Sequence, residues 1–138
     1  MRILVDTNIV MDILLKREPH FEASYSAVRY ATEQGYECFL SASAITDIFY
    51  LIRRELKNVD EARKSIERLL TLFEIADVQD VDIRNALSST MDDFEDAVVH
   101  AIAARYRADM IITRNTKDFK ETSVPVYTPG EFMERANS

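Results

Sequence analysis

Short runs of apolar residues alternate along the chain with longer stretches in which apolar side chains recur at helical spacing. The runs predict five β-strands, which we place at residues 2–5, 37–40, 73–78, 110–113 and 124–127. The longer stretches predict α-helices, as where Phe21, Tyr25 and Val28 fall on one helical face. Such alternation is typical of a mostly parallel sheet covered by helices on both faces. We therefore expect one three-layer α/β/α domain over residues 1–138, with a sheet of about five strands.

Residues with capping side chains mark where several of these helices should begin. Ser43, Asp60 and Asp80 each precede an apolar helical stripe, so we predict them as N-caps. Thr128-Pro-Gly-Glu131 has the spacing of a capping box with proline at the first helical position. The sequence therefore predicts a last short helix after the fifth strand.

The composition excludes several classes of protein. Hydrophobic residues make up 47% and charged residues 30% of the chain, the balance of an ordinary globular domain. Cys38 is the single cysteine, which excludes an intramolecular disulfide and a thiolate metal cluster. No stretch approaches the roughly 20 apolar residues of a membrane span. We expect a soluble cytoplasmic protein that does not associate with a membrane.

The formal net charge of −7 argues against a protein that binds nucleic acid with its whole surface. It does not exclude an enzyme that acts on nucleic acid. A divalent cation held by clustered carboxylates changes the potential that a phosphate meets at the site. The distribution of the acidic residues therefore matters more than their number.

Polar and acidic residues follow the expected strands or open the helices after them. They are Asp6 after the first strand, Asp47 in the helix after the second, Asp93 and Asp96 at the start of a later helix, and Asn115 and Asp118 after the fourth strand. Ligands of open α/β sheets bind at the carboxyl ends of the strands, so these residues are expected to converge. Two carboxylates about 5 Å apart repel by roughly 3 kcal/mol at an effective dielectric constant of about 20. A cation relieves this repulsion, and the set predicts a site for Mg²⁺ or Mn²⁺.

Each of these residues also has a purely structural interpretation. Asp93 and Asp47 lie where acidic side chains cap helices or interact with the helix dipole. A strand that ends in aspartate, as at Asp6, also occurs in phosphatases and receiver domains. The individual positions leave their roles open, and only the combination is specific.

The combination resembles the PIN-domain family, and within it the VapC-like toxin ribonucleases. The resemblance begins at Ile3-Leu-Val-Asp-Thr-Asn-Ile-Val-Met-Asp12 and resumes at Ser41-Ala-Ser-Ala-Ile-Thr-Asp47. It is closest from Asp93-Phe-Glu-Asp-Ala97 through Ile112-Thr-Arg-Asn-Thr-Lys-Asp-Phe119. Because Val126-Tyr-Thr-Pro-Gly-Glu-Phe132 is also similar, the resemblance covers nearly the whole chain.

The resemblance implies that Asp6, Asp47 and Asp96 bind the metal ion, with Asn115 at a fourth, less strict position. Two of these positions depart from the family's pattern. Asp47 is one methylene shorter than the usual glutamate, and Asn115 is neutral. We therefore expect a lower metal affinity than the full set of acids would give.

Further residues are implied to support this site. Thr113 matches the family's site hydroxyl and Asn8 its strand-end amide, while Asp118 is an additional carboxylate close to the fourth position. Asp93 lies one helical turn before Asp96 and can supply the charge that Asn115 lacks.

The function implied by the resemblance is that of a single-strand-preferring, metal-dependent endoribonuclease that leaves a 5′-phosphate and a 3′-hydroxyl. A small antitoxin and a second copy of the chain are the implied partners. Two alternatives stay open. The departures at Asp47 and Asn115 leave room for a degenerate PIN scaffold that binds RNA or protein without cleavage. A phosphotransfer domain centred on Asp6 is the other, although Asn8 stands where such phosphatases have a second aspartate.

The remaining candidates concern substrate binding. Arg114, Lys117 and Lys120 flank the expected site and are candidates for binding RNA phosphates. Tyr50 and Phe94 are of the type that stacks on bases, but we interpret both as core residues. We likewise interpret His100, four residues after Asp96, as structural. These interpretations depend on how each side chain packs.

Overall fold

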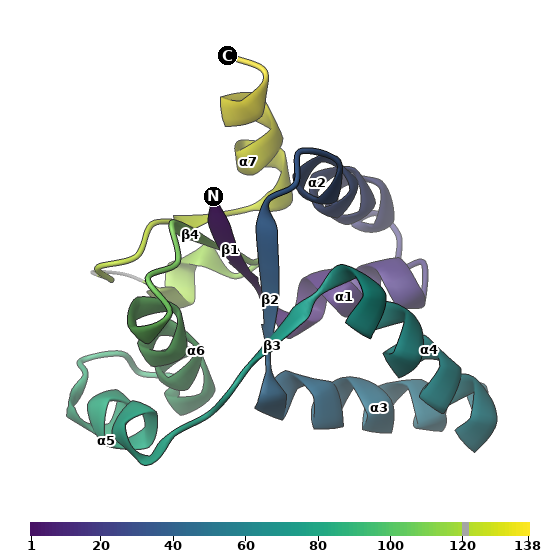
Figure 1. Ribbon diagram of the computed structural model, residues 1–138, viewed down its shortest axis with the longest axis horizontal. Helices are drawn as coiled ribbons and strands as arrows, with labels where there is room; N and C mark the ends of the chain where they lie inside the picture. The colour runs from purple at the N-terminus through teal and green to yellow at the C-terminus, as the bar shows by residue number, and fades with distance from the viewer. Residues whose placement is uncertain (120–121) are drawn as a thin grey trace.

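A five-stranded sheet lies between two layers of helices in the computed structural model, which describes residues 1–119 and 122–138 (Figure 1). The strands are β1 (Arg2–Val5), β2 (Glu37–Ser41), β3 (Glu74–Ala76), β4 (Met110–Ile112) and β5 (Val126–Tyr127). Their order is β3-β2-β1-β4-β5, and every pairing is parallel. The expected α/β class and the five strands are confirmed. Lys120 lies outside the described residues.

The helices cover both faces of this sheet. They are α1 (Thr7–Leu14), α2 (Phe21–Glu33), α3 (Ala42–Leu56), α4 (Val59–Leu72), α5 (Asp80–Ser88), α6 (Phe94–Arg105) and α7 (Pro129–Ala136), with a short 3₁₀ helix, η1 (Thr116–Phe119). Residues of α1 to α4 and α7 share one hydrophobic core, and those of α5 and α6 share the other. Within the described ranges, no helix has both the length and the apolar composition needed to cross a membrane.

The strands are apolar on both sides because each side faces a core. In β1, Ile3 and Val5 belong to the core under α1 and α2, whereas Leu4 belongs to the core under α6. All three side chains are at most 2% exposed. This two-sided burial explains why the strand is a continuous apolar run rather than an alternating one.

Three of the predicted helix starts were displaced by one or two residues. The N-caps are Ser41, Asn58 and Gln79, where the sequence predicted Ser43, Asp60 and Asp80. Asp60 and Asp80 lie instead in the first helical turn, where the helix dipole also favours an acid. The capping box at Thr128 is confirmed, with the backbone N–H of Glu131 donating to the Thr128 hydroxyl at 3.1 Å.

The order of the strands fixes where a ligand can bind. From β1 the chain passes outward to β2 and β3, then crosses on the other face to β4, which pairs with the free side of β1. Val5 and Ile112 are register partners at the carboxyl ends of these two strands. Because the connections leave β1 and β4 in different directions, a crevice forms at this edge.

Candidate active site

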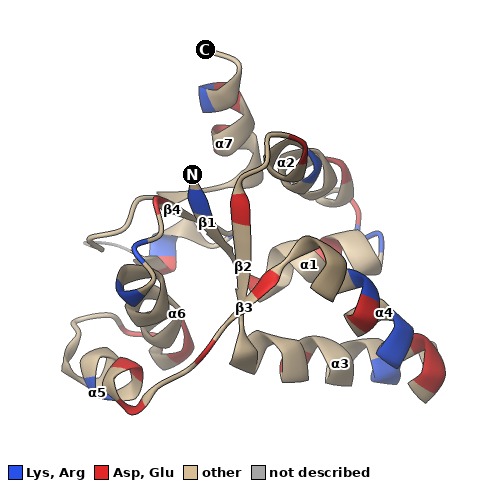
Figure 2. Cartoon of the chain, viewed as in Figure 1, with Lys and Arg blue, Asp and Glu red and all other residues tan. Residues whose placement is uncertain are grey.

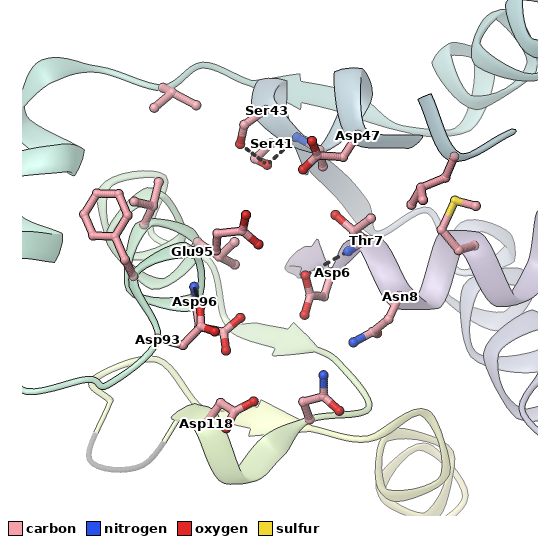
Figure 3. A pocket seen from close by; sticks show the side chains of 18 of the residues that line it. Asp6, Thr7, Asn8, Ser41, Ser43, Asp47, Asp93, Glu95, Asp96 and Asp118 are labelled. Atoms are coloured by element: carbon pink, nitrogen blue, oxygen red, sulfur yellow. Dashed lines mark hydrogen bonds between the residues drawn. The ribbon is translucent and has the colours of Figure 1, made fainter. Parts of the chain in front are cut away.

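A cavity of about 700 Å³ lies at the carboxyl ends of β1 and β4. All of the acidic and amide residues expected at the site line it, namely Asp6, Asn8, Asp47, Asp93, Asp96, Asn115 and Asp118. Glu95, which the sequence analysis had not assigned, lines it as well. The carboxylates labelled in Figure 3 come from α3, α6, η1 and the caps of α1 and α6, and they surround a common space. Residues more than a hundred positions apart are thus brought together.

Three helices begin at this cavity, and a residue that caps each of them lines it. The Asp6 carboxylate accepts the Thr7 N–H at 2.8 Å, and the Asp93 carboxylate accepts the Asp96 N–H at 3.0 Å. The Ser41 hydroxyl accepts the Ala44 N–H at 3.1 Å at the start of α3. The positive ends of three helix dipoles therefore face the cavity, which lowers the cost of gathering acids there.

Thr113 holds the two strand ends together. Its hydroxyl donates to Asp6 Oδ2 at 2.7 Å and accepts the Asn8 side-chain N–H at 3.3 Å. The backbone N–H of Asn115 donates to the same hydroxyl at 3.2 Å. Because Thr113 is fully buried, these contacts fix the orientation of Asp6 at the base of the cavity.

Two carboxylates of the cavity, Asp96 and Asp6, have raised pKa values. Burial and, second to it, the charges of Asp93, Asp6, Asp118 and Glu95 together raise the pKa of Asp96 to about 7. Burial also raises the pKa of Asp6, against the hydrogen bonds from Thr113 and Thr7, which lower it. The ionised forms of these two carboxylates are therefore disfavoured in the absence of a bound cation.

These residues fit a hard divalent cation. Carboxylate and amide oxygens are the donors that Mg²⁺ and Mn²⁺ prefer. In the described part of the chain, no three acidic, histidine or cysteine side chains are close enough to share one metal ion directly. The acids thus surround the cavity rather than meet at one point, an arrangement that suits coordination partly through water.

A family model for the PIN domain matches residues 2–117. The chain belongs to the PIN-domain family. Ribonuclease VapC1 of Aquifex aeolicus (strain VF5) is 24% identical to it over 142 residues, covering 99% of this chain and 96% of that relative.

Solved structures share the fold of this PIN domain. FitAcB from Neisseria gonorrhoeae superposes with a TM-score of 0.72 at 22% identity, covering 93% of this chain and 98% of that one. VapBC2 from Rickettsia felis, bound to a DNA fragment from its promoter, gives a TM-score of 0.68 at 16% identity, covering 92% and 97%. The expected recognition and the three-layer PIN-like architecture are confirmed.

Arg114 of this PIN domain is engaged inside the protein. Its Nε donates to Asp12 Oδ2 at 2.8 Å, and the Ser24 hydroxyl donates to the same oxygen at 3.1 Å. Asp12 is fully buried, so Arg114 neutralises a charge of the core and ties α1 to the end of β4. Lys117 is exposed on η1, and neither basic residue lines the cavity. The sequence analysis had assigned Asp12 no role, although its place one turn after Asn8 could have suggested one.

The two aromatic candidates are not core residues. Tyr50 is 72% exposed and Phe94 46% exposed, and both line the cavity. The core interpretation was wrong because each lies on the cavity side of its helix rather than on the stripe that faces the sheet.

Arg17, in the loop after α1, also lines the cavity and was missed by the sequence analysis. Its position depends on the turn at Lys16, whose φ of 48° no sequence pattern indicated.

His100 has a contact of its own away from this lining. Its Nε2 lies 3.2 Å from the Ser123 hydroxyl, in the segment before β5. Burial lowers the pKa of His100, which favours the neutral ring. The position agrees with a structural role, since the imidazole joins α6 to the chain that leads into β5.

Proposed function

We propose that this PIN-domain protein is a metal-dependent endoribonuclease that hydrolyses RNA phosphodiester bonds, and that it acts as the toxin of a toxin–antitoxin pair. The observation that carries this proposal is the set of carboxylates around one cavity, where the pKa of Asp96 rises to about 7 beside four other acids. The similarity to a relative named as a ribonuclease, along almost the whole length of both chains, supports it.

Asp6, Asp47 and Asp96 would hold Mg²⁺ or Mn²⁺, directly or through water, with Asn115 or Asp118 completing the set. When bound, such a cation lowers the pKa of a coordinated water and offsets charge on the phosphoryl oxygens. Asp6 is oriented for this role by the Thr113 hydroxyl. Asp93 keeps α6 in place by capping it and adds charge where Asn115 is neutral.

The residues around the cavity suit hydrolysis without a covalent intermediate. Asp6 accepts hydrogen bonds on both carboxylate oxygens, from Thr7 and from Thr113, which fix its orientation. The alternative of a phosphotransfer domain centred on Asp6 is disfavoured by Asn8, which stands where such phosphatases have a second aspartate. The geometry is also compatible with a non-cleaving scaffold, which the metal-dependence experiment below separates from the enzyme.

A small antitoxin and a second copy of this chain are the proposed protein partners. The proposal follows the structural neighbours, several of which were solved as toxin–antitoxin or VapBC complexes.

We place the protein in the cytoplasm, where its single buried thiol, Cys38, stays reduced. Burial raises the pKa of this thiol to about 11, which makes it unreactive. Lys117, exposed beside Asp118, remains a proposed RNA contact.

The test compares two acids on the same helix. Asp96→Asn should reduce Mg²⁺-dependent RNA cleavage by on the order of 10² or more, because transition-state charge stabilisation is lost. Asp93→Ser keeps a capping oxygen and should cost much less. Cleavage rate is measured against metal concentration for both variants, with folding checked by circular dichroism. Near-normal turnover by folded Asp96→Asn would exclude the proposed mechanism.

The same assay assigns the fourth position. If Asp93→Ser and Asp96→Asn are both inactive while Asp118→Asn cleaves normally, Asp93 is the fourth acid and Asp118 lies outside the metal site. If wild-type protein binds RNA but never cleaves it at any metal concentration, the scaffold alternative replaces the enzyme.

A further inference from the structure

Two exposed aromatic side chains border the acidic cavity. Tyr50 of α3 is 72% exposed and Phe94 of α6 is 46% exposed, yet both line the same space as Asp6. In the described ranges, neither ring stacks on another aromatic ring or lies beneath a cation. Tyr25 is exposed to a similar degree, at 43%, but its ring packs on Phe21 at 5.6 Å and lies outside the cavity. Exposure alone is ordinary, and the shared cavity is what distinguishes the first two.

Each of these rings stands beside a carboxylate of the site. Tyr50 follows Asp47 by three residues on α3 and so lies on the same helical face. Phe94 directly follows Asp93 at the start of α6. In Figure 3, Asp47 of α3 and Glu95 of α6 extend into the cavity from different sides. Tyr50 belongs to α3 and Phe94 to α6, so the two rings come from different walls of the cavity. Both rings therefore share the cavity with the acids at which a phosphate would bind.

Arg17 supplies the one positive charge among the described residues that line this cavity, which also holds six carboxylates. Its guanidinium forms no ion pair within the part of the chain that the structure describes. The neighbouring Arg114, in contrast, is committed to Asp12. In Figure 2, basic and acidic bands alternate along α4, and the basic residues of α3 lie near its carboxyl end. Arg17 is therefore the cation best placed to meet a phosphate.

We propose that Tyr50 and Phe94 stack on unpaired bases next to the scissile phosphate, and that Arg17 binds a neighbouring phosphate. The inference rests on the proposed ribonuclease function and identifies residues that bind single-stranded RNA. A ring at a cavity wall reaches the face of a base only when that base is unstacked, as in a loop or a single strand. Stacking tolerates any base, so these contacts supply affinity without reading the sequence.

Binding is measured in the Asp96→Asn background with Mg²⁺, where the bound RNA should stay intact. The probe is a short single-stranded RNA of mixed sequence that carries the fluorescent base aminopurine, whose emission falls when it stacks. Tyr50→Leu and Phe94→Leu should each weaken binding about tenfold and reduce the quenching. Tyr25→Leu is the matched control and should change neither. In the active enzyme the same two variants should raise KM and leave kcat nearly unchanged.

The phosphate contact has its own readout. Arg17→Gln should reduce the slope of log K against log salt by about 0.7, the value for one phosphate contact on a single strand. Arg63→Gln removes an exposed arginine on α4 outside the cavity and should leave the slope unchanged.

Failure of this inference can be distinguished from failure of the proposed function. If Tyr50→Leu and Phe94→Leu bind the probe as tightly as their parent, the stacking role is wrong, whereas loss of cleavage in Asp96→Asn would still support the nuclease. If these variants bind RNA normally but lose the antitoxin, the rings belong to a protein interface and the inference is overturned. Near-normal cleavage of the probe by Asp96→Asn would instead contradict the proposed function.

Discussion

Aspartates near the two ends of α6 are in opposite electrostatic states. At its carboxyl end, Arg105 donates to Asp82 at 2.9 Å and to Asp77 at 3.1 Å. Hydrogen bonds, from Tyr106 above all, lower the pKa of Asp77 to about 2. At its amino end, Asp96 has a pKa raised to about 7 by burial and by the acids around it. The carboxyl end of α6 thus supplies a cation to two acids of other segments, whereas its amino end lies among acids that raise the pKa of Asp96.

This difference separates carboxylates that are paired within the protein from those that we propose as the metal site. The Arg105 network closes α5 and the end of β3 onto α6, and Asp82 also completes the capping box of α5. Every group there finds its partner inside the chain, as a structural network requires. At the cavity, in contrast, burial and the charges of neighbouring acids raise the pKa of Asp96 and Asp6, which is typical of sites where function is maintained at the expense of stability.

The largest effect is expected when the contacts of Arg105 with Asp82 and Asp77 are removed. Arg105→Met leaves Asp82, which is 1% exposed, as an unpaired buried charge, and should lower the free energy of unfolding by about 3–5 kcal/mol. Arg84→Met is the control because its pair with Asp80 is exposed on both sides, and it should cost about 0.5 kcal/mol or less. Urea denaturation measures both. If the two variants lose equal free energy of unfolding, the buried Arg105 network stabilises the protein no more than an exposed ion pair does.

The next effect concerns the binding of a divalent cation among the acids at the amino end of α6. Mn²⁺ at about a hundred times its Kd should stabilise the wild-type protein by about 2.7 kcal/mol and raise its Tm accordingly. Asp6→Asn should remove most of that gain, whereas Asp60→Asn, on the exposed first turn of α4, should keep it. An unchanged Mn²⁺ shift in Asp6→Asn would place the cation elsewhere.

A smaller effect is expected from pH in the absence of metal. Because the pKa of Asp96 is about 7 when folded and 3.8 as its ordinary value, the folded protein holds a proton that the unfolded chain releases between about pH 4 and 7. Stability should therefore fall as the pH rises through that window, by on the order of 1 kcal/mol after solvent screening. Urea unfolding in EDTA at the two ends of the window measures it.

Two changes should abolish this pH dependence. Asp96→Asn removes the titrating group and should flatten the profile. Saturating Mn²⁺ favours the ionised carboxylate and should restore stability at the alkaline end. A wild-type protein whose stability rises with pH in EDTA would contradict the raised pKa.

The smallest effect separates capping from charge at Asp93. Asp93→Ser keeps an oxygen that can accept the Asp96 N–H, while Asp93→Ala does not. Asp93→Ala should therefore be less stable than Asp93→Ser by about 1 kcal/mol. Both variants remove the same charge, so both should lower the pKa of Asp96 equally. If the two are equally stable, the cap contributes nothing and Asp93 is retained for its charge alone.

The sequence by itself determined the order of the elements and most of the site. Local patterns sufficed for the strand β1, for the capping role of Asp93 and for the box at Thr128, because each depends on neighbours within a few residues. The site acids were predictable because strand ends of a parallel sheet must share one edge. Ser41 rather than Ser43 became the cap of α3 because the strand before it runs directly into the helix.

Only the tertiary structure decided which side chains those residues meet. The pairing of Arg114 with Asp12, the cluster that raises the pKa of Asp96, and the exposure of Tyr50 at the cavity all join elements distant in sequence. Helical spacing tells which residues share a face, but it does not tell whether that face is covered. The exposure of a side chain and the charges that surround it depend on all its neighbours in space, and these neighbours are set only when the helices pack on the sheet.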